Sequence, residues 1–269
     1  MAVARRVRRK DEKVLKPVHP NAGIAAEYRR RIEALVDAMA KSVTYWVRAR
    51  YKANEPRMAL DEVPANELQR AIDDMTRQWD YKFDDAADRL AKWFAKKVYE
   101  RSGDTLAKIL EDAGLSVEFK MTAAMRDVFN ATVEQNVALI KSIPSQYLTQ
   151  VQGSVMRSVQ AGRDLGSLTK DLQEHFGVTR RRAATIARSQ NNMATATMTA
   201  SRQKELGITH AIWLHSGGGR EPRPSHVAQS GKPYDVNTGW FDPDEKKWIL
   251  PGTLINCRCV SRPVIKGFS

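Results

Sequence analysis

The chain has 269 residues, a formal net charge of +13 and 42% hydrophobic residues, enough for one large or two modest domains with a buried core. The charge favours contact with a polyanion such as nucleic acid, an acidic protein surface or anionic lipid. No run approaches the roughly 18 to 20 apolar residues of a membrane span, and the N-terminus lacks the apolar run of a signal peptide. The two cysteines, Cys257 and Cys259, exclude a disulfide framework and indicate a protein kept in a reducing cytoplasm.

Residues 1–20 are predicted to be a flexible basic arm. Its candidate contacts with DNA or with a partner protein are Arg5, Arg6, Arg8, Arg9 and Lys10. Pro17 and Pro20 follow, and such a run does not pack into a core. The alternative is a solvated tail with no partner.

Residues 21–162 are predicted to form a helical domain. Apolar residues recur at spacings of three and four over 22–51, 66–101 and 121–144, and the charges lie on the opposite faces, as in a helical bundle. Gly103 and Gly114 are expected to bracket a separate short helix, and Pro144 is expected to begin a new one that ends near Gly162. The aromatic and methionine stripes are interpreted as core.

Residues 163–269 are predicted to form a module of helix and short strands. Gly177 is expected to close a short helix, and Thr179 to cap a second one over 180–206. Between Ser189 and Ser201 this second helix interleaves amide and hydroxyl residues with alanine. We expect it to lie beneath the C-terminal segment, with its amides bonded to loop backbone groups.

The last part of the chain alternates in the manner of strands. Short strands are expected over 208–215, 232–236 and 258–264. The predicted fold class is therefore mainly α (α+β), a helical N-terminal region followed by the helix-plus-short-strands module. Arg180, Arg181 and Arg182 form a candidate second basic patch for DNA or a partner.

Four residues of this module are candidate metal ligands. His226, Cys257 and Cys259 are residue types that bind zinc, and His215 is a possible fourth ligand. The Cys-x-Cys spacing is tighter than usual for zinc, so two buried structural thiols are the alternative. A cysteine nucleophile with His226 as base is conceivable, but no residue pattern orients that histidine. We therefore predict a protein that is not an enzyme.

An ordered set of motifs resembles the phage Mu F-like minor head proteins, also called phage head morphogenesis proteins. The set is Ile186 to Gln190, Trp213, Arg223-Pro224-Ser225-His226, Gly231, Asn256-Cys257-Arg258-Cys259 and Pro263. The resemblance covers roughly residues 165–265. It implies a virion protein present in few copies near the portal vertex and assembled in the host bacterial cytoplasm. Its partners would be the portal protein and other head proteins, and its role would lie in head assembly and in DNA packaging or ejection.

The chain departs from this family at one motif. Many relatives have Cys-x-x-Cys where this chain has Arg223 and His226, so three of four ligands for a structural zinc remain. The resemblance thus leads to a structural minor head protein. Two alternatives stay open: a non-specific binder of double-stranded DNA carried in the virion, or an effector enzyme or toxin module, for which no catalytic set is visible.

Overall fold

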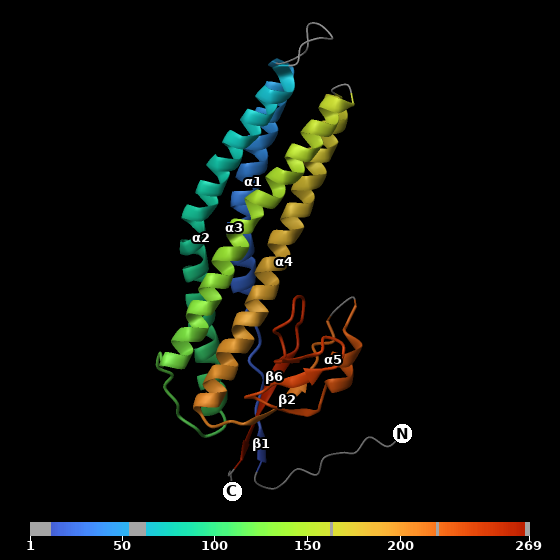
Figure 1. Cartoon of the computed structure of the whole chain (residues 1–269). Helices are drawn as coiled ribbons and strands as arrows, with labels where there is room; N and C mark the ends of the chain where they lie inside the picture. The colour runs from blue at the N-terminus through green and yellow to red at the C-terminus, as the bar shows by residue number, and fades with distance from the viewer. Residues whose placement is uncertain (1–11, 54–62, 162–163, 219–220, 267–269) are drawn as a thin grey trace. The chain divides into compact units, whose positions relative to one another are not determined.

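The computed structural model describes residues 12–53, 63–161, 164–218 and 221–266. Four long helices are followed by short strands, which confirms the predicted mainly α (α+β) class (Figure 1). The helices are α1 (Ala22–Ala53), α2 (Val63–Glu111), α3 (Ala123–Gln160), α4 (Leu165–Glu205) and the short α5 (Pro224–Gln229). The strands are β1 (Glu12–Val14), β2 (His210–Leu214), β3 (Pro233–Asp235), β4 (Trp240–Asp242), β5 (Lys247–Ile249) and β6 (Val260–Lys266). Within these described ranges, none of the helices has the length and apolarity needed to span a bilayer.

The contacts divide the chain into two compact units. Within the described residues, the first comprises 12–24, 95–132 and 189–266, and the second comprises 25–94 and 133–188. Both are thus assembled from segments that are distant in the sequence. The predicted boundary at residues 162–163 lies outside the described residues and stays a prediction.

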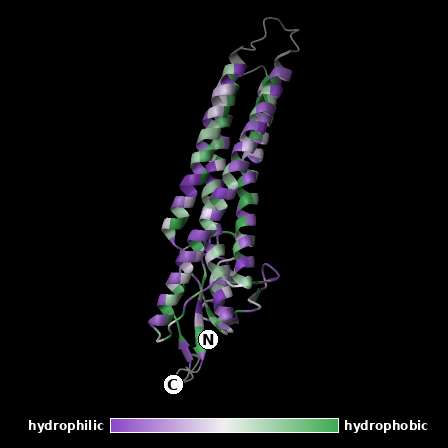
Figure 2. Cartoon of the chain, turned by 90° about the vertical axis from the view of Figure 1, so that its left-hand side faces the viewer, coloured by the Kyte–Doolittle hydropathy of each residue, from purple (hydrophilic) through white to green (hydrophobic). Residues whose placement is uncertain are grey.

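The second unit is a bundle of parts of α1, α2, α3 and α4. Each helix carries apolar residues at helical spacing on one side and charged residues on the other (Figure 2). Tyr28 of α1 stacks on Phe94 of α2 with ring centroids 4.3 Å apart, and its hydroxyl donates to Asn136 of α3. Trp46 belongs to an aromatic stripe that was interpreted as core, but it is 47% exposed. The core stripe of α1 is therefore narrower than expected.

Three predicted helix breaks are wrong. Gly103 lies inside α2, where a Cβ atom would stand 3.0 Å from the guanidinium of Arg202, so close approach explains this glycine. Pro144 lies inside α3 among the buried Ile140, Ile143 and Tyr147. Their packing offsets the lost hydrogen bond, which costs about 3 kcal/mol.

The break expected at Thr179 is absent for a similar reason. Thr179 does not cap a new helix, because its hydroxyl donates to the carbonyl of His175 one turn earlier, as in a helix interior. Gly177 also lies inside α4, so residues 165–205 form one helix. Packing along the whole length of α4 outweighs the local tendency of Gly177 to end a helix and of Thr179 to begin one.

The first unit contains an antiparallel sheet in the order β1-β6-β2-β3. The strands expected near residues 208–215, 232–236 and 258–264 are β2, β3 and β6. β1 was expected to belong to the flexible arm, but Val14 pairs with Val264, and Leu15 and Val18 are buried with Leu106 and Leu110. Burial of these apolar side chains outweighs the cost of ordering the segment. A separate hairpin, β4–β5, pairs Trp240 with Ile249.

Candidate metal centre

Three donor atoms of the first unit converge near the start of β6. Nδ1 of His226 lies 3.5 Å from Sγ of Cys257 and 3.6 Å from Sγ of Cys259. All three side chains are buried, and their donor atoms lie within 4.8 Å of one another. The structure therefore brings together the three ligands predicted from the sequence.

The loop between β5 and β6, residues 250–259, contains both cysteines, and we call it the cysteine loop. It is held by the polar face of α4. The backbone N–H of Asn256 donates to Ser189 Oγ, and Asn192 Nδ2 donates to the carbonyl of Cys257 at 2.8 Å. This confirms the expected role of the amides in α4. Asn256 has a φ of 61°, a left-handed conformation that asparagine tolerates. The reversal it makes directly precedes Cys257 and helps to aim both sulfurs at His226.

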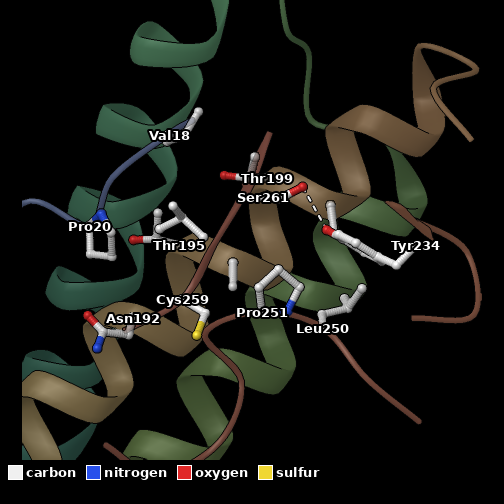
Figure 3. Close-up of a pocket in the computed structure, with 13 residues that line it drawn as sticks. Val18, Pro20, Asn192, Thr195, Thr199, Tyr234, Leu250, Pro251, Cys259 and Ser261 are labelled. Atoms are coloured by element: carbon white, nitrogen blue, oxygen red, sulfur yellow. Dashed lines mark hydrogen bonds between the residues drawn. The ribbon is translucent and has the colours of Figure 1, made fainter. Parts of the chain in front are cut away.

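Close packing between α4 and the loop also depends on Gly252. At its φ of 92° a Cβ atom would lie 3.2 Å from the side chain of Ala196. Beside this contact is a small cavity of ≈ 20 Å³, drawn in Figure 3, where Asn192, Thr199 and Cys259 contribute to the wall. Tyr234 closes part of the wall by donating to Ser261 Oγ at 2.6 Å. The cysteine loop is thus seated on small and polar residues of α4.

His226 is fixed by aromatic rings and by one carboxylate. Its ring packs edge-on against Trp213 of β2 and Trp240 of β4, with centroids 5.1 and 6.2 Å away. Its Nε2 lies 3.1 Å from Oδ2 of Asp242, and Asp242 has no exposed surface. Because an ionised carboxylate only accepts hydrogen bonds, Nε2 carries the proton and Nδ1 faces the sulfurs.

Asp242 is a site residue that the sequence analysis missed. It lies on β4, whose alternation places Trp240 and Asp242 on the inner face and Phe241 outside. Together with Lys247-Trp248-Ile249, this alternation around a polar turn is a hairpin signal. Recognising that hairpin would have placed an acidic residue on the buried face.

The electrostatics favour a thiolate beside a protonated ring in the absence of a metal. Hydrogen bonds from the Cys259 thiol, from His226 and from backbone N–H groups hold the pKa of Cys257 well below its ordinary value. The contact with Cys257 and burial together raise the pKa of Cys259. Burial lowers the pKa of His226, but Cys257 and Asp242 outweigh it and raise the pKa overall. Binding of a metal ion would displace the protons that His226, Cys257 and Cys259 share.

The donor set fits a zinc ion. In a tetrahedral site with Zn–S of about 2.3 Å and Zn–N of about 2.05 Å, nitrogen and sulfur stand about 3.6 Å apart, which matches the observed 3.5 and 3.6 Å. Two thiolates and one neutral imidazole also balance the charge of a divalent cation, so the buried centre would be neutral. Cys257, Cys259 and His226 are the residues that would hold the ion.

The structure does not bring His215 into this cluster. His215 lines a cavity of ≈ 40 Å³ next to the three ligands. Its Nδ1 accepts the N–H of Gly217, so the proton of the neutral ring sits on Nε2 and no lone pair faces a metal. The cavity has room for at least one water.

Arg223 also lines this cavity. Its guanidinium donates to the carbonyl of Ile255 and lies 3.3 Å from Glu245. It therefore ties the cysteine loop to the β4–β5 turn by hydrogen bonds and an ion pair.

The two cysteines, His226 and Asp242 also have the arrangement of a nucleophile, a base and a carboxylate that orients the base. Two features favour metal binding over nucleophilic catalysis. Both sulfurs lie at nearly equal distances from Nδ1, and each cysteine is only 4% exposed, which leaves little of either residue open to a substrate.

The described basic residues that were predicted to contact DNA or a partner protein do not form one patch. Arg5, Arg6, Arg8, Arg9 and Lys10 lie outside the described residues. Arg180 pairs with Glu33 and Asp37, Arg182 donates to Ser142, and Arg181 is exposed. Successive helical residues point about 100° apart, so the three arginines of α4 do not share one face.

Comparison with known proteins identifies the part of the chain that contains this centre. Residues 149–262 match the family described as Phage Mu protein F like protein. An uncharacterised protein of Haemophilus influenzae is 36% identical over 154 residues, which is 56% of this chain. The match spans 32% of that protein, about a third of its length. No solved structure matches the chain.

Proposed function

We propose that this chain, whose residues 149–262 match the Phage Mu F-like family, is a minor head protein of a tailed bacteriophage that acts in head assembly. The observation that carries the proposal is this family match, within which α4, the cysteine loop and α5 form one hydrogen-bonded site. The partners are other proteins of the phage head, and the location is the virion.

The finer part of the proposal places the protein near the portal vertex, with a role in DNA packaging or ejection. Supporting it are the formal net charge of +13 and the basic run Arg5 to Lys10, which suit contact with DNA entering or leaving the head. The described part of the chain N-terminal to the family match, which holds α1, α2 and most of α3, would supply further surface for contacts with the portal protein.

We also propose that a structural zinc ion holds the C-terminal part of the first unit together. The chain from β2 to β6 consists largely of turns and of strands of three to seven residues, and a two-stranded hairpin such as β4–β5 is marginal by itself. A zinc ion bound by His226, Cys257 and Cys259 would join α5 to the loop before β6. When bound, it supplies folding free energy and no chemistry of its own.

A nonsense mutation in the gene tests the head function. Phage made without the protein should yield few DNA-filled, infectious heads by electron microscopy and plaque counts, and expression in trans should restore them. Normal filled heads would refute the proposal. Co-purification with portal protein from assembling heads tests the finer placement, and its absence from portal-containing complexes would contradict it.

Non-specific binding of double-stranded DNA in the virion is the second candidate function, favoured by the same charge. Binding to random duplex DNA should then weaken steeply as salt rises. Replacing Arg5, Arg6, Arg8, Arg9 and Lys10 with glutamine should reduce both the affinity and the salt dependence. Absent or salt-insensitive binding at low ionic strength would exclude this function.

A further inference from the structure

The second unit contains a groove that the head-protein function does not explain. It is ≈ 730 Å³ in volume and lies between α1 and α4, two helices that are labelled in Figure 1. Its lining from α1 is Asp37, Ala40, Lys41, Thr44, Tyr45, Arg48 and Ala49, and its lining from α4 is Leu172, Gln173, Phe176 and Arg180.

The groove is straight and of helical length. Its α1 residues follow the three-and-four spacing of a single helix face, and its α4 residues do the same. From Asp37 to Ala49 the helix rises about 18 Å, at about 1.5 Å per residue. This length matches roughly three turns of a helix lying parallel to α1 and α4.

The floor of the groove is apolar, and an aromatic side chain stands at its edge. Ala40 and Leu172 are buried, Phe176 is partly buried, and Tyr45 is 65% exposed. An exposed aromatic next to an apolar floor is typical of surfaces that bind protein side chains. A DNA backbone would find few donors on such a floor.

The charge of the rim selects the partner. Among the residues that line the groove, α1 contributes two basic side chains, Lys41 and Arg48, against one carboxylate, Asp37. Within the described residues, neither Lys41 nor Arg48 forms an ion pair, and the one acidic residue of the lining, Asp37, is paired with Arg180. A partner therefore meets an uncompensated positive rim on the α1 side.

We propose that this groove binds an amphipathic helix of another protein, with apolar anchors at i, i+3 or i+4 and i+7 and acidic residues on its flank. The anchors would lie on Ala40, Leu172 and Phe176, and the acidic flank would face Lys41 and Arg48. The inference does not depend on the head-protein function, since it rests on the groove alone.

The test uses two labelled helical peptides of about five turns, one with leucine anchors and glutamate flanks and one with lysine in place of glutamate. By fluorescence anisotropy, the full-length protein should bind the acidic peptide saturably and at least tenfold more tightly than the basic one. Random duplex DNA, added as competitor, should not displace the peptide.

Two variants locate the binding. Lys41→Glu/Arg48→Glu should weaken it at least tenfold, whereas Lys92→Glu/Lys96→Glu, which changes the net charge equally at exposed positions of α2, should leave it within twofold. Ala49→Trp should block the groove without changing its charge. Equal effects of the two charge reversals, equal binding of both peptides, displacement by DNA, or no saturable binding would overturn the proposal.

Discussion

The carboxylate of Asp242 lies 3.1 Å from Nε2 of His226, and both residues are buried. The other oxygen of Asp242 accepts the backbone N–H of Asp244 at 3.0 Å, so the carboxylate is itself held in place. This fixes the proton of His226 on Nε2 and leaves Nδ1 for the two sulfurs. Asp242 of the β4–β5 hairpin thereby orients the ring of His226 in α5, so that Nδ1 faces the cysteine loop.

Asp242→Asn should therefore weaken zinc binding about 10- to 100-fold, the usual effect of losing a carboxylate that orients a ligating histidine. The measurement is competition with a chromophoric chelator. Asp244→Asn is the matched control, because the side chain of Asp244 is exposed and only its backbone contacts Asp242. Equal affinities for both variants would show that Asp242 does not position the ligand.

Purified protein should contain close to one zinc per chain by elemental analysis. Chelation should lower the melting temperature, because the ligands then lose the bond that crosslinks α5 to the cysteine loop. Cys257→Ser and Cys259→Ser should each lower the zinc content and the melting temperature. Ser216→Ala, which removes a hydroxyl from the wall of the neighbouring cavity and keeps the backbone hydrogen bond to Cys259, should change neither. A zinc content near zero in the unmodified protein would refute the metal site.

Periodicity predicted the helices because burial of one apolar face is a repeating signal along the chain. It predicted helix breaks at Gly103 and Pro144 that the structure does not have. Gly103 is explained by one distant partner, and Pro144 by the packing around it. Arg202 fills the space beside Gly103, and its guanidinium donates to Ser102 Oγ and to the carbonyl of Tyr99. A pairing across 100 residues leaves no trace in local spacing.

The candidate site was predictable as a set of ligand types but not as a geometry. His226, Cys257 and Cys259 were named because few other residue types bind zinc. Asp242 was missed because a carboxylate that orients a histidine has no fixed spacing from it in sequence. His215 was named by residue type alone, and a hydrogen bond from Gly217 turns its lone pair away.

Stability should fall at alkaline pH because of the buried Tyr147. Burial raises its pKa to about 12, and a contact with Thr44 offsets only part of that rise. The unfolded chain loses this proton above about pH 10, whereas the folded chain keeps it. The contribution of Tyr147 is therefore complete below pH 10 and is lost as the pH rises from 10 to 12.

Urea unfolding of the wild type and of Tyr147→Phe measures this effect. The variant has no proton to lose at this position, so the wild type should lose about 1 kcal/mol more than the variant between pH 8 and pH 11. Tyr81→Phe, at a position 74% exposed, is the control and should follow the wild type. Parallel curves for wild type and Tyr147→Phe would contradict the prediction.

Gly239→Ala should disrupt the hairpin that carries Asp242. Gly239 has a φ of 85°, and a Cβ atom there would lie 2.5 Å from the carbonyl oxygen of Ile249 in β5. Because backbone atoms of the paired strand cannot yield as a side chain can, the substitution should cost about 3 kcal/mol or displace β4. Either outcome moves Asp242, so zinc affinity should fall together with stability.

Gly231→Ala is the control that tests the left-handed backbone conformation without the close contact. Gly231 has a similar φ of 82°, but a Cβ atom there would meet nothing within 4 Å. This control should cost only about 1 kcal/mol, the strain of a left-handed alanine, and should leave zinc affinity unchanged. If the two variants lost equal stability and bound zinc equally well, the approach of Gly239 to Ile249 would not be what holds Asp242 against His226.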